Sequence, residues 1–220
     1  GVLELLRELP DYLLPSTIDI AGELLVDPPE IVHAWLDHTN IWAGVAALLA
    51  GVPVIVLSTR NMNPTHFPYL YAEWFKEWYR FLAQCRGVHL INNSTAGAAD
   101  YADWLDIPVA RMHVVRNGLD FDTIERPVPA AVEAWRRTLG LAPEDRLVAG
   151  VLRLSDEKQP LTLVEVMRRA MTQVPRLHVV IAGVGALMDD VRAAVERSGF
   201  ADRFHLVGRQ KDVPVIMSAS

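Results

Sequence analysis

Residues 146–183 decide the fold, and they read RLVAGVLRLSDEKQPLTLVEVMRRAMTQVPRLHVVIAG. The continuous apolar run at 147–152 is typical of a strand buried on both faces of a sheet, and LHVVIAG at 177–183 predicts a second strand. Between them, Pro160 suits the first turn of a helix. The apolar residues of this helix recur at helical spacing and are Leu163, Val166, Met167, Ala170, Met171 and Val174. Strand, helix and strand in this order form a βαβ unit with parallel strands and a right-handed crossover.

The alternation of strands and helices extends in both directions from this unit. Downstream come a helix at 186–199, a strand at 203–208 and a further helix at 212–220. Upstream, the sequence predicts strands at 31–36, 52–58, 88–93 and 111–115, with helices at about 40–50, 69–85 and 95–105. We therefore expect an α/β fold of two Rossmann-like, doubly wound parallel-sheet domains, both incomplete, with a cleft between them.

The domain boundary is expected near Thr123. Residues 120–135 hold acidic residues and two prolines and indicate a linker that leads into a helix. The expected domains are therefore residues 1–123 and 124–220. Gly1 stands at the start of an apolar helical pattern over residues 2–9, without a Met, and this indicates a fragment of a longer protein.

The composition excludes several classes of protein. Of the 220 residues, 51% are hydrophobic and 22% charged, which is typical of a globular chain. The net charge of −6 argues against a nucleic-acid partner. The lone Cys85 excludes an internal disulfide and fits a reducing compartment. Residues 39–59 carry no charge, but Gly51 and Pro53 divide them into a helix and a strand, so we expect a soluble chain.

Two cations follow the strand at 147–152. Arg153 and Lys158 lie at its carboxyl end, where ligands bind to open parallel sheets. The next helix begins near Pro160, so its N–H groups and positive dipole end face the same place. Cations in a surface loop are most often only solvated. Together with a helix N-terminus, however, these two indicate a phosphate or diphosphate site.

Glycines and further cations follow the next two strands. Gly183 and Gly185 would let a ligand approach the backbone closely, and Gly208 is followed by Arg209 and Lys211. A lone Gly-x-Gly is a weak signal, and here it lacks the third glycine of the dinucleotide-binding pattern. The coincidence of these features at one edge of a sheet carries the hypothesis of a binding site.

The same residues carry a resemblance to a known family. Residues 150–220 resemble the second domain of the GT-B-fold retaining glycosyltransferases of the "glycosyl transferases group 1" family, which are family 4-like. The matching residues are Arg153, Leu154, Glu157, Lys158, Pro175, Gly183, Gly185, Gly208, Asp212, Val213 and Pro214. The first half is similar to the family at 28–56, 92–108 and 114–120.

The resemblance implies transfer of a hexose, with retention, from a UDP- or GDP-sugar to a glycan or lipid-linked acceptor. Arg153 and Lys158 would hold the donor diphosphate and stabilise the charge on the leaving nucleotide. No metal and no other cofactor are then required. The implied role is synthesis of a surface polysaccharide or another glycoconjugate in the cytoplasm or at the inner face of the membrane.

This sequence also departs from the family pattern. A Pro-Ser-x-x-Glu-Gly loop and a Glu-x7-Glu motif would follow Ser220, and a glycine-rich acceptor loop would precede Gly1, so we expect these residues alone to be inactive. Arg60 stands where the family commonly has a His, and it is a candidate contact for acceptor or phosphate.

The first half holds further candidates for the cleft, each with a structural alternative. Asp37 and His38 either contact the acceptor or cap the helix near Asn40. Ser94 either caps the helix at 95–105 or borders the cleft. Asn117 is part of an Asn-Gly turn signal and also matches a family segment near the hinge. The remaining candidate, His33, is interpreted as a hydrogen-bonded core residue.

The aromatic segment at 66–82 predicts a core helix. Tyr71, Phe75, Trp78 and Leu82 share one face, whereas Trp74 and Phe81 lie beside basic residues. Packing within the domain and peripheral contact with a membrane are both open for these two. Two alternatives to a transferase remain. One is a GT-B-like sugar-nucleotide epimerase, and the other is a non-catalytic module that binds a nucleotide or a partner.

Overall fold

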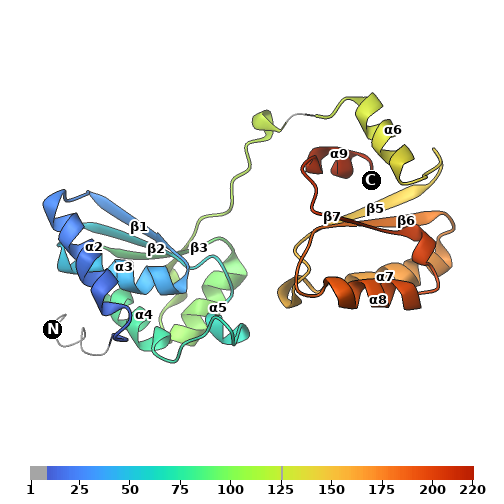
Figure 1. The fold of residues 1–220 in the computed structure, drawn as a ribbon. Coiled ribbons are helices and arrows are strands. Elements are labelled where there is room, and N and C mark those ends of the chain that lie inside the picture. Colours follow the sequence, from blue (N-terminus) through green and yellow to red (C-terminus); the bar gives the residue numbers. More distant parts are fainter. Residues whose placement is uncertain (1–8, 125) are drawn as a thin grey trace. The chain divides into compact units, whose positions relative to one another are not determined.

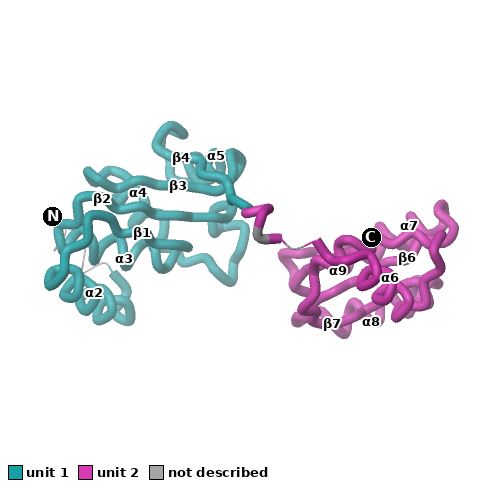
Figure 2. The backbone as a smooth tube through the Cα atoms, turned by 90° about the horizontal axis from the view of Figure 1, so that it is seen from above, with its two compact units in different colours: residues 1–119 teal, residues 120–220 magenta. Residues whose placement is uncertain are grey.

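The computed structural model describes residues 9–124 and 126–220. The chain divides into two compact units, residues 1–119 (unit 1) and residues 120–220 (unit 2), which Figure 2 colours separately. Each unit holds one parallel sheet, of four strands in unit 1 and three in unit 2, so the predicted α/β class with parallel sheets is confirmed. The helix expected over residues 2–9 lies, except for Leu9, outside the described residues. The acceptor and donor roles of the two halves stay predictions.

Unit 1 consists of parallel strands in sequential order with helices between them. The strands are β1 (Ile31–Trp35), β2 (Val54–Ser58), β3 (Val88–Asn92) and β4 (Met112–Val114). The helices are α2 (Leu14–Val26), α3 (Asp37–Leu49), α4 (Phe75–Gln84) and α5 (Thr95–Leu105). All four strands begin and end close to their predicted bounds. Helix α2, which precedes β1 and packs on α3, is an addition to the predicted elements.

The helices of unit 1 cover one face of its sheet (Figure 1). The core there includes Phe75, Trp78 and Leu82 of α4, as the sequence predicts. The prediction for Tyr71 is wrong, because α4 begins only at Phe75 and the Tyr71 side chain is exposed. Trp74 and Phe81 are partly buried against the same core, which confirms packing within the domain.

The other face of this sheet is open along β1. The strand alternates in the usual way, so that Ile31, His33 and Trp35 point to one side and are exposed, while Ala34 is buried on the other. Trp35 remains 46% exposed. These side chains lead toward the carboxyl end of the sheet, where they help to form a hollow described below.

Unit 2 is a sheet with helices on both faces. Its strands are β5 (Arg146–Val151), β6 (Leu177–Ala182) and β7 (Phe204–Gly208), again parallel and in sequential order. Helices α7 (Pro160–Gln173) and α8 (Met188–Arg197) lie on one face, and α6 (Pro129–Thr138) and α9 (Val213–Ser218) on the other (Figure 1). Each face has its own apolar cluster, one around Val179 and Ile181 and one around Val180 and Ala182.

Two predictions about burial in unit 2 are wrong. Strand β5 is not buried on both faces, since it lies at the edge of the three-stranded sheet and leaves Val148 and Val151 exposed. Val166 is 50% exposed, whereas Val164 is buried. The buried side of α7 runs through Val164 and Met171, so the apolar residue at 166 falls outside it.

A buried carboxylate joins three helices of unit 1. Asp37 is 8% exposed, and its Oδ1 accepts hydrogen bonds from the hydroxyls of Tyr79 at 2.8 Å and Tyr101 at 2.7 Å. Asn40 donates through Nδ2 to the Tyr79 hydroxyl at 2.9 Å and to the Ser58 carbonyl at 3.0 Å. Helix α3 begins at Asp37 itself rather than near Asn40, which turns this carboxylate into the core. The prediction that Asp37 faces a cleft is therefore wrong.

Removing this carboxylate should weaken unit 1. We expect Asp37→Ala to lower the free energy of unfolding by about 1–3 kcal/mol, because it leaves two buried hydroxyls without their acceptor. Urea denaturation followed by tryptophan fluorescence checks this. The fluorescence reports mainly on unit 1, because five of the six tryptophans lie there and only Trp135 lies in unit 2. The control is Asp103→Ala, at an exposed position on α5, with an expected change within about 0.5 kcal/mol. Equal effects of the two substitutions would contradict the structural role.

Ionisation of Asp37 should make unit 1 less stable as the pH rises. Burial raises the pKa of Asp37 above its ordinary 3.8, and the hydrogen bonds from Tyr101 and Tyr79 only partly oppose this. The folded chain therefore binds the proton more tightly than the unfolded chain. This contribution is complete below pH 3.8 and is lost as the pH rises through the folded-state pKa. Asp37→Asn removes the titration, so the unfolding free energy of the native chain relative to this variant should fall as the pH rises from 3.8 through the folded-state pKa of Asp37. If the difference in unfolding free energy between the native chain and Asp37→Asn does not change with pH, the raised pKa of Asp37 is contradicted.

Candidate functional site

The carboxyl ends of the three strands of unit 2 surround a hollow of about 460 Å³. Its lining residues are Val151, Leu152, Arg153, Ala182, Gly183, Val184, Gly185, Arg209 and Gln210. The fold thus brings together four residues that the sequence singles out, from three different strand ends. We call this the unit-2 hollow. Its position agrees with the rule that open parallel sheets bind ligands beyond the carboxyl ends of their strands.

Arg153 and Lys158 lie on the loop between β5 and α7. The Arg153 side chain is largely exposed, and its Nη1 lies 3.9 Å from Oε1 of Glu157. Lys158 is exposed in a short 3₁₀ turn, two residues before α7 begins at Pro160. It does not line the unit-2 hollow, so only one of the two predicted cations does.

The carboxylate between these cations is held in its charged form. The nearby Ser155 hydroxyl, the backbone of Glu157 itself, and the charges of Arg153 and Lys158 lower the pKa of Glu157. No side chain caps the start of α7, whose N-cap residue Gln159 has a left-handed backbone. The N–H groups of this first turn therefore face outward beside two cations, an arrangement suited to an anion.

The glycines after β6 are required by the packing of two loops. A Cβ on Gly183 would lie 1.8 Å from the Leu152 carbonyl oxygen, and one on Gly185 would lie 2.2 Å from that of Leu154. Gly183 also has a φ of +148° and donates to the Gly208 carbonyl at 2.8 Å. Both glycines line the hollow, and the space on the Cβ side of each α-carbon is filled by the β5–α7 loop, so contact of their backbone with a ligand stays a prediction. They act by holding that loop in place at the rim of the hollow.

Unit 1 has a hollow of about 520 Å³ at the carboxyl ends of its own strands. Its lining residues are His33, Trp35, Ser58, Arg60, Ile91, Asn92, Asn93, Val115, Arg116, Asn117, Gly118 and Leu119. We call this the unit-1 hollow. It brings together Arg60 and Asn117 from the predicted set, but Asp37, His38 and Ser94 do not line it.

Three side chains stack at the rim of the unit-1 hollow. His33 and Trp35 have their ring centroids 4.5 Å apart, and the Arg60 guanidinium carbon lies 4.7 Å from the Trp35 ring centre. His33 Nε2 is 2.9 Å from the Ser58 hydroxyl. The interpretation of His33 as a core residue is wrong, because it lies on the open face of β1. Side chains two residues apart in a strand point to the same face of the sheet, so His33 and Trp35 share a face. This alternation is the sequence signal that predicts the exposed position of His33.

The other candidates of unit 1 form contacts within the unit, and contact of His38 with the acceptor stays a prediction. His38 is exposed and contacts Trp74 and Phe75 edge to face. Ser94 caps α5, and its hydroxyl accepts from the Gly97 N–H at 3.0 Å, so the predicted N-cap is confirmed. A role for Ser94 beside a cleft stays a prediction.

Metal and membrane features can be assessed for the described residues only. Within residues 9–124 and 126–220, no three His, Cys, Asp or Glu side chains are grouped so as to hold a metal ion. Over the same ranges, every helix is too short or too polar to cross a bilayer. Independence from metal stays a prediction.

Adding a methyl group at Gly183 should disrupt the unit-2 hollow. We expect Gly183→Ala to destabilise β6 and β7 by about 3 kcal/mol or more, since left-handed strain and overpacking each cost about 1–3 kcal/mol. Amide hydrogen exchange along β6 measures this. Gly199→Ala is the control, because its φ of +78° adds strain but open space surrounds it, so it should cost only about 1–2 kcal/mol. Similar losses for both variants would show that loop packing is not the constraint.

Comparison with known proteins gives the family. The model described as Glycosyltransferase Family 4 matches residues 3–123. The Vi polysaccharide biosynthesis protein VipC/TviE of Salmonella typhi is 28% identical over 210 residues, which cover 95% of this chain and 36% of the relative. The UDP-Gal:alpha-D-GlcNAc-diphosphoundecaprenol alpha-1,3-galactosyltransferase of Escherichia coli is 25% identical over 210 residues, covering 94% of this chain and 54% of the relative. The chain thus spans between about a third and a half of these relatives.

Solved structures agree on the fold. Anabaena Alr3699/HepE in complex with UDP has a TM-score of 0.79 at 18% identity, covering 94% of this chain and 55% of that one. The lipopolysaccharide outer core galactosyltransferase WaaB has a TM-score of 0.63 at 14% identity, covering 94% and 51%. Because the identity is low, these structures show the architecture only. The family match covers more than half of the residues, and the chain belongs to glycosyltransferase family 4.

Proposed function

We propose that this chain is part of a glycosyltransferase that moves a hexose from a UDP-sugar to a glycan or lipid-linked acceptor. Unit 2 binds the donor at the unit-2 hollow, and unit 1 binds the acceptor. The observation that carries the proposal is the cationic strand edge, Arg153 and Arg209 beside the uncapped start of α7, in a chain of family 4. This arrangement supports binding of a nucleoside diphosphate.

Electrostatic stabilisation is the chemistry that these residues offer. When the sugar leaves, negative charge builds up on the diphosphate, and preorganised cations at the hollow lower the energy of that state. Arg153 and Lys158 are free to turn toward such a ligand, because both side chains are exposed. They would hold the diphosphate without a metal ion. We also propose that the transfer retains the anomeric configuration, because the sequence resembles retaining glycosyltransferases.

The relatives favour a UDP-sugar over a GDP-sugar. The Escherichia coli relative is described by a UDP-Gal donor and a diphosphoundecaprenol acceptor, and the Anabaena structure holds UDP. A lipid-linked acceptor would bring the enzyme to the inner face of the membrane, within surface polysaccharide synthesis. We also propose that the complete protein has the doubly wound GT-B architecture. Sugar transfer would then require family motifs that are not found in residues 1–220. These residues alone are then expected to bind UDP without transferring sugar.

The charge of Arg153 at the unit-2 hollow and that of Lys158 on the same loop should dominate nucleotide binding. We expect Arg153→Ala and Lys158→Ala each to weaken binding of UDP by about 1.5–3 kcal/mol, the range for a hydrogen bond to a charged group. Titration calorimetry with the 220-residue chain measures this. Arg197→Ala, at the exposed end of α8, removes an equal charge away from the hollow and should leave affinity unchanged. The donor-site proposal fails if the native chain does not bind UDP, or if all three variants bind as it does.

A further inference from the structure

The unit-1 hollow is basic although the chain as a whole is acidic. Arg60 and Arg116 line it together with the amides of Asn92, Asn93 and Asn117, and none of the described lining residues is a carboxylate. The whole sequence carries a net charge of −6. The lining of this hollow is therefore positively charged, whereas the chain as a whole carries a net negative charge.

The backbone of Arg60 is held in an unfavourable conformation. Its φ is +66°, in the left-handed region that residues with side chains rarely occupy. Asn92 holds the two residues that flank Arg60, because its Nδ2 donates to the Thr59 hydroxyl at 2.6 Å and to the Asn61 carbonyl at 2.8 Å. The Thr59 N–H also donates to the Ile91 carbonyl at 3.0 Å. Strain that is held by its surroundings in this way is typical of functional positions.

The side chain of Arg60 is supported by a ring rather than by an acid. Its guanidinium lies over Trp35, and within the described residues it forms no ion pair. Partial burial and the nearby Arg60 charge lower the pKa of His33, which disfavours a competing cation beside Arg60. The stack therefore positions one guanidinium fork and leaves its N–H groups available to a ligand.

We infer that the unit-1 hollow binds an oxyanion, a phosphate or a sugar carboxylate, carried by the acceptor. This inference rests on the proposed function, because it assigns the acceptor to unit 1. Arginine forms paired hydrogen bonds with both kinds of oxyanion, which explains why two arginines line this hollow while none of its described lining residues is a carboxylate. The hollow has the size of a small-molecule site and accommodates a sugar together with its charged group.

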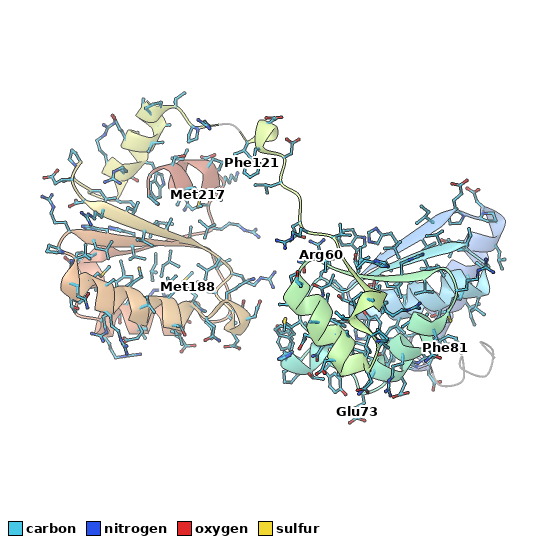
Figure 3. All side chains as sticks on the ribbon, turned by 180° about the vertical axis from the view of Figure 1, so that it is seen from behind. Arg60, Glu73, Phe81, Phe121, Met188 and Met217 are labelled. Atoms are coloured by element: carbon cyan, nitrogen blue, oxygen red, sulfur yellow. The ribbon has the colours of Figure 1, made fainter. Side chains whose placement is uncertain are left out.

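The position of Arg60 fits this role. Arg60 lies two residues beyond the end of β2, and Arg116 and Asn117 follow β4, so the strands on both sides of β3 contribute to one site. Figure 3 shows the Arg60 side chain beside the segment by which the chain leaves unit 1. A neutral acceptor would leave the charge of Arg60 without a partner in a partly enclosed site, at a cost in free energy.

The test compares three small probes on the 220-residue chain: N-acetylglucosamine 1-phosphate, glucuronate and neutral N-acetylglucosamine. Binding is followed by the NMR signals of the tryptophan indole N–H groups, which include that of Trp35. At least one anionic probe should bind about tenfold more tightly than the neutral sugar, and the tighter of the two identifies phosphate or carboxylate as the source. Arg60→Gln should weaken that binding about tenfold, and Arg60→Lys less.

Two controls separate this site from the donor site. Arg86→Gln removes an exposed arginine at the opposite, amino end of β3 and should change nothing. The double variant Arg153→Ala/Lys158→Ala should keep the anionic probe and its Trp35 response while UDP binding is weakened. Arg60→Gln should in turn leave UDP binding unchanged.

Equal binding of all three probes, or full anion affinity in Arg60→Gln, would overturn the inference. If the native chain binds an anionic probe through Arg60 but does not bind UDP, the oxyanion site is supported and the proposed donor function fails. If UDP binds through Arg153 and Lys158 while no probe discriminates by charge, the proposed function stands and the oxyanion site is wrong.

Discussion

The parallel hydrogen bonding of neighbouring strands is the constraint on which both hollows depend. In unit 2, Val151 pairs with Ala182, and the chain leaves β5, β6 and β7 at one edge. The same is true of β1 to β4 in unit 1. A parallel register gathers the residues that follow each strand, however far apart they are in the sequence. Arg153 and Arg209, or Arg60 and Asn117, meet only for this reason.

The two strand edges use different means to present positive charge. In unit 2, Arg153 and Arg209 line a hollow whose rim is fixed by Gly183 and Gly185, while Lys158 and the first turn of α7 follow on the β5–α7 side, outside the lining. In unit 1, a strained arginine is fixed by an aromatic ring and by an asparagine clamp. The first arrangement suits a ligand that brings several charges. The second suits one oxyanion on a larger neutral molecule.

Periodicity in the sequence predicts most of the elements, because alternating strands and helices have different repeat lengths. It predicts burial less well. Val148 is exposed because β5 lies at a sheet edge, and Asp37 is buried because α3 starts three residues early and two tyrosines complete its hydrogen bonds. The stack of Arg60 on Trp35 joins two strands whose pairing only the fold defines. The glycines after β6 were recognised, but the loop that packs on them was not.

Amide hydrogen exchange of the chain with and without UDP tests the central claim most directly, since it reports where a nucleoside diphosphate lies. The account predicts slower exchange at the start of α7 and in the β6–α8 loop, with unit 1 unchanged. Protection that falls on unit 1, or on neither unit at saturating UDP, would contradict the assignment of the donor to the strand edge of unit 2.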